Sequence, residues 1–147
     1  MAVATPAEVL QGPWTLELPF RASSVRHARR ALDAALRRCR VPFARRSDAA
    51  VVLSELLANS LRHARPLRGN RLGVRWHVTD DAIELAVGDA GSTSAPTALP
   101  AGALAQSGRG LAIVQALATE WGVAGVRSEH QVVWALLPRD TLDGRGS

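Results

Sequence analysis

The sequence predicts an α+β fold, a two-layer α/β sandwich in which a mostly antiparallel mixed sheet carries its helices on one face. Three observations lead to this prediction. Two segments place apolar residues at helical spacing, two pairs of short segments alternate in the manner of β-hairpins, and no sustained β-α-β alternation appears. Helices and hairpins in separate runs are typical of an antiparallel sheet covered on one side.

The N-terminal part predicts an edge strand followed by a helix. Trp14, Leu16 and Leu18 alternate as in a strand before Pro19 interrupts the pattern. The helix that follows can be capped by Ser23 or Ser24 and ends by Pro42. Its apolar positions recur with the helical period and are Val25, Ala28, Leu32, Ala35 and Leu36.

A second helix and a hairpin come next. We expect Ser47 to cap this helix, with Asp48 in the first turn and the end before Pro66. Its apolar stripe consists of Ala49, Val52, Leu53, Leu56 and Leu57. Residues 72–78 and 83–87 then alternate on either side of a polar turn, which predicts a β-hairpin.

The C-terminal part begins with a long irregular segment. Residues 88–110 are rich in Gly, Ser, Pro and Ala and exceed the usual length of a loop, which favours a lid. A short helix is predicted over residues 111–118, and strands over 122–126 and 132–136. The expected organisation is a flexible leader over residues 1–12, one domain over 13–138 and a flexible tail over 139–147.

Composition is that of a soluble globular domain and argues against two classes of ATP enzyme. A chain of 147 residues with 47% hydrophobic content can bury a core without metal or disulfide. All 18 basic residues are Arg, whereas a P-loop and a eukaryotic-type protein kinase each need a Lys on the nucleotide. The single Cys39 forms no internal disulfide, and no signal peptide or membrane-length apolar stretch is present, which predicts a cytoplasmic protein.

The net charge of +5 raises nucleic-acid binding as an alternative. The basic residues of the first helix recur at helical spacing beside its apolar stripe, and they are Arg26, Arg29, Arg30, Arg37 and Arg38. No nucleic-acid-binding motif and no row of aromatic residues accompanies them, so we expect a solvated helix face and no nucleic-acid partner.

Glu55 and Asn59 are the first candidates for chemistry. They lie four residues apart in the second helix, so they share a face at the flank of the apolar stripe, and His63 continues the row. Taken alone, they are also compatible with an ordinary exposed polar pair. The functional interpretation makes the Asn59 amide oxygen a Mg²⁺ ligand and Glu55 a general base beside a terminal phosphate.

Two further candidates flank the predicted lid. Asp89 ends an apolar strand and can accept a hydrogen bond from the exocyclic amine of adenine, while Gly91 would let a base approach the backbone. Gly108, Arg109 and Gly110 stand directly before a helix, where backbone amides and the positive helix end would face an anion. In isolation each of these segments could equally be a simple turn or a helix cap.

The combined pattern resembles the Bergerat-fold ATPases, and within them the small bacterial anti-sigma serine kinases. Residues 54–64 (SELLANSLRHA) are similar to the family's N-box, residues 87–91 (VGDAG) to its adenine box and residues 108–114 (GRGLAIV) to its second glycine box. The three boxes occur in the family's order, and the resemblance covers about residues 14 to 137.

The resemblance implies an ATP-binding site and its cofactors, ATP and Mg²⁺. It makes Glu55 the catalytic base and Asn59 the Mg²⁺ ligand, and it makes the segment after Gly91 the ATP lid. The nucleotide-binding residues that it implies are Asn59, His63, Asp89, Gly91, Gly108, Arg109, Gly110 and Leu111. His63 matches an N-box position and not a phosphorylated histidine, and no phosphoacceptor His domain is visible.

The function that the resemblance implies is a regulatory serine/threonine kinase. It would phosphorylate a small antagonist protein of the STAS type, sequester a sigma factor and form a homodimer, without nucleic-acid or membrane partners. The alternative is a binding module of the same fold that nucleotide gates or that has lost catalysis. This alternative rests on two departures from the family, Ser92-Thr93-Ser94 after the adenine box and Glu129-His130-Gln131 in the final hairpin.

Overall fold

The computed structural model describes residues 14–91, 110–125 and 130–140, which form three helices and five strands in these parts of the chain. The expected leader, the lid and most of the expected tail lie outside the described residues. In chain order the elements are β1 (Leu16–Pro19), α2 (Ser23–Arg38), α3 (Phe43–His63), β2 (Arg71–Val78), β3 (Ala82–Asp89), α5 (Gly110–Leu117), β4 (Glu120–Ala124) and β5 (Gln131–Pro138).

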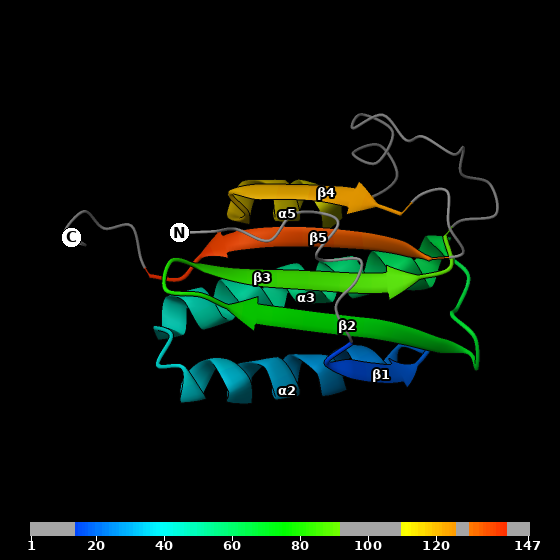
Figure 1. The fold of residues 1–147 in the computed structure, drawn as a ribbon, viewed down its shortest axis with the longest axis horizontal. Coiled ribbons are helices and arrows are strands. Elements are labelled where there is room, and N and C mark those ends of the chain that lie inside the picture. Colours follow the sequence, from blue (N-terminus) through cyan, green and yellow to red (C-terminus); the bar gives the residue numbers. More distant parts are fainter. Residues whose placement is uncertain (1–13, 92–109, 126–129, 141–147) are drawn as a thin grey trace.

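The strands form one sheet in the order β1-β2-β3-β5-β4, and all four pairings are antiparallel. Figure 1 shows the sheet in front and the three helices behind it. This arrangement confirms the predicted α+β sandwich with helices on one face. Because β5 pairs with β3, the last strand of the chain lies inside the sheet and β4 forms an edge.

The core lies between the sheet and the helices. β3 contributes Ile83, Leu85 and Val87, which alternate along the strand and are fully buried. α3 lies in the middle of the helical layer, where it contacts α2, α5, β3 and β5. Its buried side includes the whole predicted stripe, Ala49, Val52, Leu53, Leu56 and Leu57. The helical period in the sequence therefore identified the face that drives packing.

Both helix starts differ from the predicted capping. α2 begins at Ser23 after Ala22, with no side-chain cap, because Ser24 is buried and donates its hydroxyl to the Pro19 carbonyl at 2.6 Å. Pro19 itself is the last residue of β1 and does not interrupt it. The Ser23 or Ser24 cap was therefore wrong.

α3 begins at Phe43, one turn before the predicted Ser47 cap. Pro42 has an extended backbone, and its carbonyl accepts the N–H groups of Arg45 and Arg46 at 3.0 Å. The fixed φ of proline thus starts the helix without a capping side chain. Asp48 lies beyond the first turn and pairs with Arg45 at 3.1 Å.

The strand and short-helix predictions are otherwise confirmed within a few residues. The hairpin of residues 72–78 and 83–87 corresponds to β2 and β3, and the helix of residues 111–118 corresponds to α5. β4 begins two residues earlier than predicted, and β5 extends at both ends. No helix in the described parts of the chain combines the length and apolar character needed to cross a bilayer.

The sheet face away from the helices has a small cluster of its own. Gly73 and Gly88 lie opposite each other on β2 and β3, and they alternate with core residues, so they face outward. Trp14 packs its indole directly over both glycines. A Cβ at Gly88 would come within 2.1 Å of the Trp14 ring, and one at Gly73 within 2.4 Å. The two glycines therefore form the seat of this tryptophan.

We predict that Gly88→Ala lowers the free energy of unfolding by about 1–3 kcal/mol, because the Trp14 ring must leave its seat. In a Trp14→Ala background the same change should cost almost nothing, since the clashing ring is gone. Urea unfolding of the two single variants and the double variant tests this coupling. Additive effects of the two changes would contradict it.

Candidate functional site

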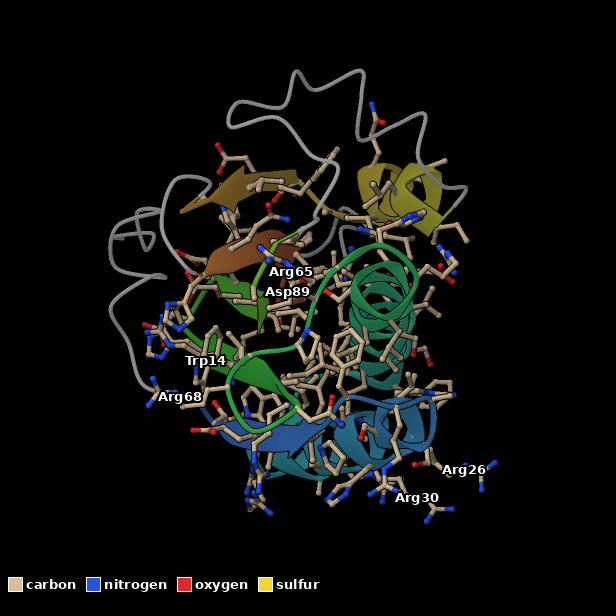
Figure 2. The ribbon with its side chains drawn as sticks, turned by 90° about the vertical axis from the view of Figure 1, so that its right-hand side faces the viewer. Trp14, Arg26, Arg30, Arg65, Arg68 and Asp89 are labelled. Carbon is tan, nitrogen blue, oxygen red and sulfur yellow. The ribbon has the colours of Figure 1, made fainter. Side chains whose placement is uncertain are left out.

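The end of β3 carries a buried carboxylate that is held from two sides. Asp89 is 1% exposed, and its Oδ2 accepts the Ser60 hydroxyl of α3 at 2.5 Å. Its Oδ1 accepts the Gly91 backbone N–H at 2.8 Å. Figure 2 views the end of the molecule at which β3 and α3 finish, with Asp89 near its centre. The two contacts fix the orientation of the carboxylate and leave each oxygen with further acceptor capacity.

Burial raises the pKa of Asp89 above its ordinary value, because removal from water penalises the charged form. The hydrogen bonds from Ser60 and Gly91 oppose this effect and lower the pKa, but the desolvation is larger. Asp89 is thus a carboxyl group whose charge state depends strongly on its partners. That property is common where a carboxylate serves a ligand.

Gly91 has a left-handed backbone, with φ of 83°, which a side chain would strain. Two backbone hydrogen bonds of 2.9 Å join this turn to the chain after α3, from Arg65 to Gly91 and from Ala90 to Arg65. The Arg65 guanidinium also donates to the Ala90 carbonyl at 3.2 Å. The Asp-Ala-Gly turn is therefore fixed by Arg65 as well as by Ser60.

A cavity of about 530 Å³ opens beside this turn. It is lined by Arg65, Pro66, Leu67, Arg68, Ala90 and His130.

Asn59, next to Ser60 on α3, has a buried polar atom without a partner among the described residues. It precedes Ser60 on α3 and is only 9% exposed, yet its Oδ1 has no hydrogen-bond partner among the described residues. A buried acceptor left without a donor is costly, so such an atom indicates a ligand that completes it. An amide oxygen is a donor that Mg²⁺ accepts. The residue thus fits the predicted metal role.

A cation held here would need more ligands than Asn59. Among the described residues, no three His, Cys, Asp or Glu side chains are arranged to hold a metal ion. Mg²⁺ commonly completes its coordination with water and substrate phosphates. Asn59 is therefore compatible with a metal that arrives together with a phosphate ligand.

Glu55 and His63 continue the row of Asn59 in opposite directions. Glu55 is half-buried, one turn earlier on α3, and forms no hydrogen bond or ion pair with the described residues. Its carboxylate is thus available to accept a proton. His63 is exposed and is the last residue of α3.

The glycine turn is described only from Gly110, the first residue of α5, so Gly108 and Arg109 lie outside the described residues. The topology nevertheless orients α5. β4 starts opposite the end of β5, at the end of the sheet far from Asp89. Two residues separate the end of α5 from the start of β4. The N-terminus of α5 therefore points toward the Asp89 end of the sheet, as Figure 1 shows. The Leu111 side chain is buried in the core, which restricts it to a backbone contact with any ligand.

Sequence reasoning missed two residues of this site, Ser60 and Arg65. Ser60 had a signal, because it is a polar residue on the buried stripe that Leu56 and Leu57 define. Its partner Asp89 is 29 residues away in the sequence, so no local pattern could predict the hydrogen bond between them. Arg65 acts largely through its backbone, which no side-chain pattern reveals.

The raised pKa of Asp89 gives a prediction with a defined sign. A carboxyl whose folded pKa is raised stabilises the fold most below its ordinary pKa of 3.8, and this contribution is lost as the pH rises through the folded value. Asp89→Asn should therefore gain stability relative to the wild type as the pH rises from acid to neutral. Ser60→Ala, which removes a hydrogen bond to the charged form, should extend the wild-type loss to higher pH.

Urea unfolding at a series of pH values measures this dependence. Asp80→Asn, at an exposed position in the β2–β3 turn, is the matched control for removal of a charge. Parallel pH profiles for the wild type and Asp89→Asn would show that the charge of Asp89 does not oppose folding.

Comparison with protein families supports the fold. A search of curated proteins finds no match to the chain. The family model of the histidine kinase-like ATPase domain matches residues 18–135, which include part of each strand pairing and the entire row of α3. The match covers most of the chain and is consistent with the α+β fold. The chain belongs to the family of histidine kinase-like ATPase domains.

Proposed function

We propose that the protein is a regulatory serine/threonine kinase that transfers a phosphoryl group from Mg-ATP to a hydroxyl of a small antagonist protein and sequesters a sigma factor. One observation carries the catalytic part of the proposal. Asn59 holds a buried amide oxygen without a partner, one helical turn after the half-buried Glu55. A metal ligand and a base at adjacent turns of one helix are two of the groups that such a transfer uses.

In this proposal, Asp89 recognises the adenine. Each of its carboxylate oxygens accepts one hydrogen bond within the protein, so each keeps a lone pair for the exocyclic amine of the base. The turn at Gly91 has no side chain that would keep a flat ring from the backbone. Ser60 and Arg65 act as positioning residues, because they hold the carboxylate and the turn and need not touch the nucleotide.

The bound nucleotide and metal would supply the phosphoryl group and its counter-charge. Asn59 would hold the metal through Oδ1, and Gly110 and Leu111 would present backbone N–H groups at the start of α5 to the phosphates. Glu55 would accept the proton of the attacking hydroxyl, so that the oxygen becomes nucleophilic as its O–H bond breaks. We also propose that Gly108 and Arg109 contact the phosphates. His63 would contact the nucleotide, as its position in the N-box implies.

The regulatory part of the proposal rests on the resemblance of the three boxes to those of anti-sigma serine kinases. It gives the antagonist a serine or threonine as acceptor, gives the protein a sigma factor as its second partner and makes a homodimer the expected assembly. Cytoplasmic localisation and the absence of nucleic-acid and membrane partners belong to the same proposal.

A second candidate is a protein-binding module of the same fold. Its partner binding is controlled by nucleotide, or it has lost catalysis. One observation favours it. Gln131 faces Asp89 in the β3–β5 register, and its Oε1 lies 3.7 Å from the point where a Cβ of residue 91 would stand. An amide side chain therefore adjoins the turn that the base would approach. If it competes with the base for this space, nucleotide binding is weakened.

The melting temperature in Mg-ATP separates the kinase from a module that no longer binds nucleotide. A ligand bound only by the folded state stabilises it, by about 2.7 kcal/mol at a concentration 100 times Kd. We expect Mg-ATP to raise the melting temperature of the wild type and not that of Asp89→Asn. Asn59→Ala should bind ATP without the additional effect of Mg²⁺, whereas Gln115→Ala, an exposed amide on α5, should behave as wild type. No rise at millimolar Mg-ATP would contradict the kinase and favour the module.

Glu55→Gln tests the assignment of the base. The variant keeps a side chain of the same shape but cannot accept the proton, so phosphoryl transfer to an antagonist protein should fall by about 10²–10⁴-fold. Its stabilisation by Mg-ATP should remain. Labelled ATP and phosphoamino-acid analysis measure the transfer and identify the acceptor, with Glu120→Gln as a control at an exposed glutamate. Unchanged labelling would remove Glu55 from the mechanism.

A further inference from the structure

A groove of about 590 Å³ runs between α2 and α3 on the side of the helical layer that faces away from the core. Its α2 wall spans Arg26 to Arg37, about 16 Å of helix. Five arginines and one aspartate line it: Arg26, Arg29, Arg30, Arg37, Arg46 and Asp33. Sequence reasoning treated the arginines of α2 as a solvated face, and they are exposed in the structure. Four of them, Arg26, Arg29, Arg30 and Arg37, also lie along one concave surface.

The positive charge of this arginine groove is not neutralised from within. Asp33 accepts Arg46 at 3.0 Å and pairs with Arg37 at 3.0 Å, so its two oxygens are already engaged. Arg26, Arg29 and Arg30 are exposed and make no hydrogen bond or ion pair with the described residues. In Figure 2 the side chains of Arg26 and Arg30 project outward from the molecule.

Between the arginines the groove has small, uncharged residues. Ala34 of α2 and Ser47 and Ala50 of α3 line it, and they allow the backbone of a partner to come close. Val51, next to this row, is 41% exposed and adds an apolar side chain beside the groove. Small residues flanked by projecting charges suit an amphipathic helix that lies in a groove.

We propose that the arginine groove binds an acidic helical segment of a partner protein. Arginine presents a planar set of donors that matches a carboxylate in a bidentate manner, and Arg26 and Arg30 repeat at the spacing of successive helical turns. Glutamates at the same spacing on a partner helix would meet both. This proposal does not depend on the nucleotide site, because none of its residues belongs to α5, β3 or the row of Asn59.

Charge argues against other occupants of the arginine groove. Each of the chain segments outside the described residues carries at most one acidic residue, namely Glu8, Glu129 and Asp143. A second copy carries the same net charge of +5. For single-stranded nucleic acid, a row of stacking platforms would be expected beside the charges. No aromatic residue lines the groove, and the one ring against a groove arginine is the exposed Phe43, 5.5 Å from the Arg46 guanidinium among the described residues. We therefore take a carboxylate-rich protein helix as the occupant, and duplex DNA is an outcome of the test.

The probe for a test is a fluorescein-labelled synthetic helix of about 18 alanine and glutamate residues, with its glutamates on one face. Anisotropy with the full chain, at about 0.15 M salt, measures its binding. The double variant Arg26→Glu/Arg30→Glu should weaken binding by at least about tenfold through like-charge repulsion. The double variant Arg21→Glu/Arg68→Glu changes the net charge equally at exposed positions outside the groove and should weaken it far less.

Controls make each outcome decisive. A peptide with glutamine in place of every glutamate should not bind. Circular dichroism should show both double variants folded, because Arg26 and Arg30 have no hydrogen bond or ion pair with the described residues to lose. Equal losses in the two double variants would reduce the effect to general attraction and overturn the proposal. Tighter binding of a DNA duplex, with the same dependence on Arg26 and Arg30, would overturn it in favour of nucleic acid, and so would failure of the acidic peptide to bind at all.

Discussion

The buried Asp89 carboxylate is the interaction on which the organisation of the site depends. It ends the central strand β3, accepts a hydroxyl from α3 through Ser60, and accepts the N–H of its own turn at Gly91. Desolvation works against its charge, so these donors are needed to keep a carboxylate there at all. The consequence is a fixed relation between the strand that would read the base and the helix that would hold the metal.

α3 has three roles, and the residues for each role lie on a different side of the helix. One side supplies the core with Leu53 and Leu57. A flank carries Glu55 and Asn59 toward the end of the sheet, and the opposite flank lines the arginine groove through Ser47 and Ala50. Because a helix is stiff over this length, ligands at the two flanks act on one rigid body. Any link between nucleotide and partner would have to pass through this helix or through the start of α5, which packs on it.

The sequence predicted the fold well where the signal was periodic. The stripe of α3 and the alternation in β2 and β3 follow directly from burial on one face, and the structure reproduces them. The sequence predicted the structure poorly where a single residue determines the exact start of an element. Ser47 is a good cap in isolation, yet Pro42 starts α3 a turn earlier. The seat of Trp14 on Gly73 and Gly88, and the bond from Ser60 to Asp89, join residues far apart in the chain, and no local pattern encodes them. The motif positions Glu55, Asn59 and Asp89 lie on the elements expected of them, but the roles assigned to them stay predictions, as do those of Gly108 and Arg109.

The position of β5 inside the sheet has a consequence for biosynthesis. β3 receives its second neighbour only when residues 131–138 have been made, although β2 and β3 are complete more than forty residues earlier. During translation the central strand therefore has an open edge, and the apolar side of α3 has only part of its cover. Pairing of β3 with β5 must close a long loop, which slows folding relative to local hairpins. The chain thus completes its native sheet only when β5 has been made, and until then β3, its most buried strand, is exposed to chaperones and to aggregation.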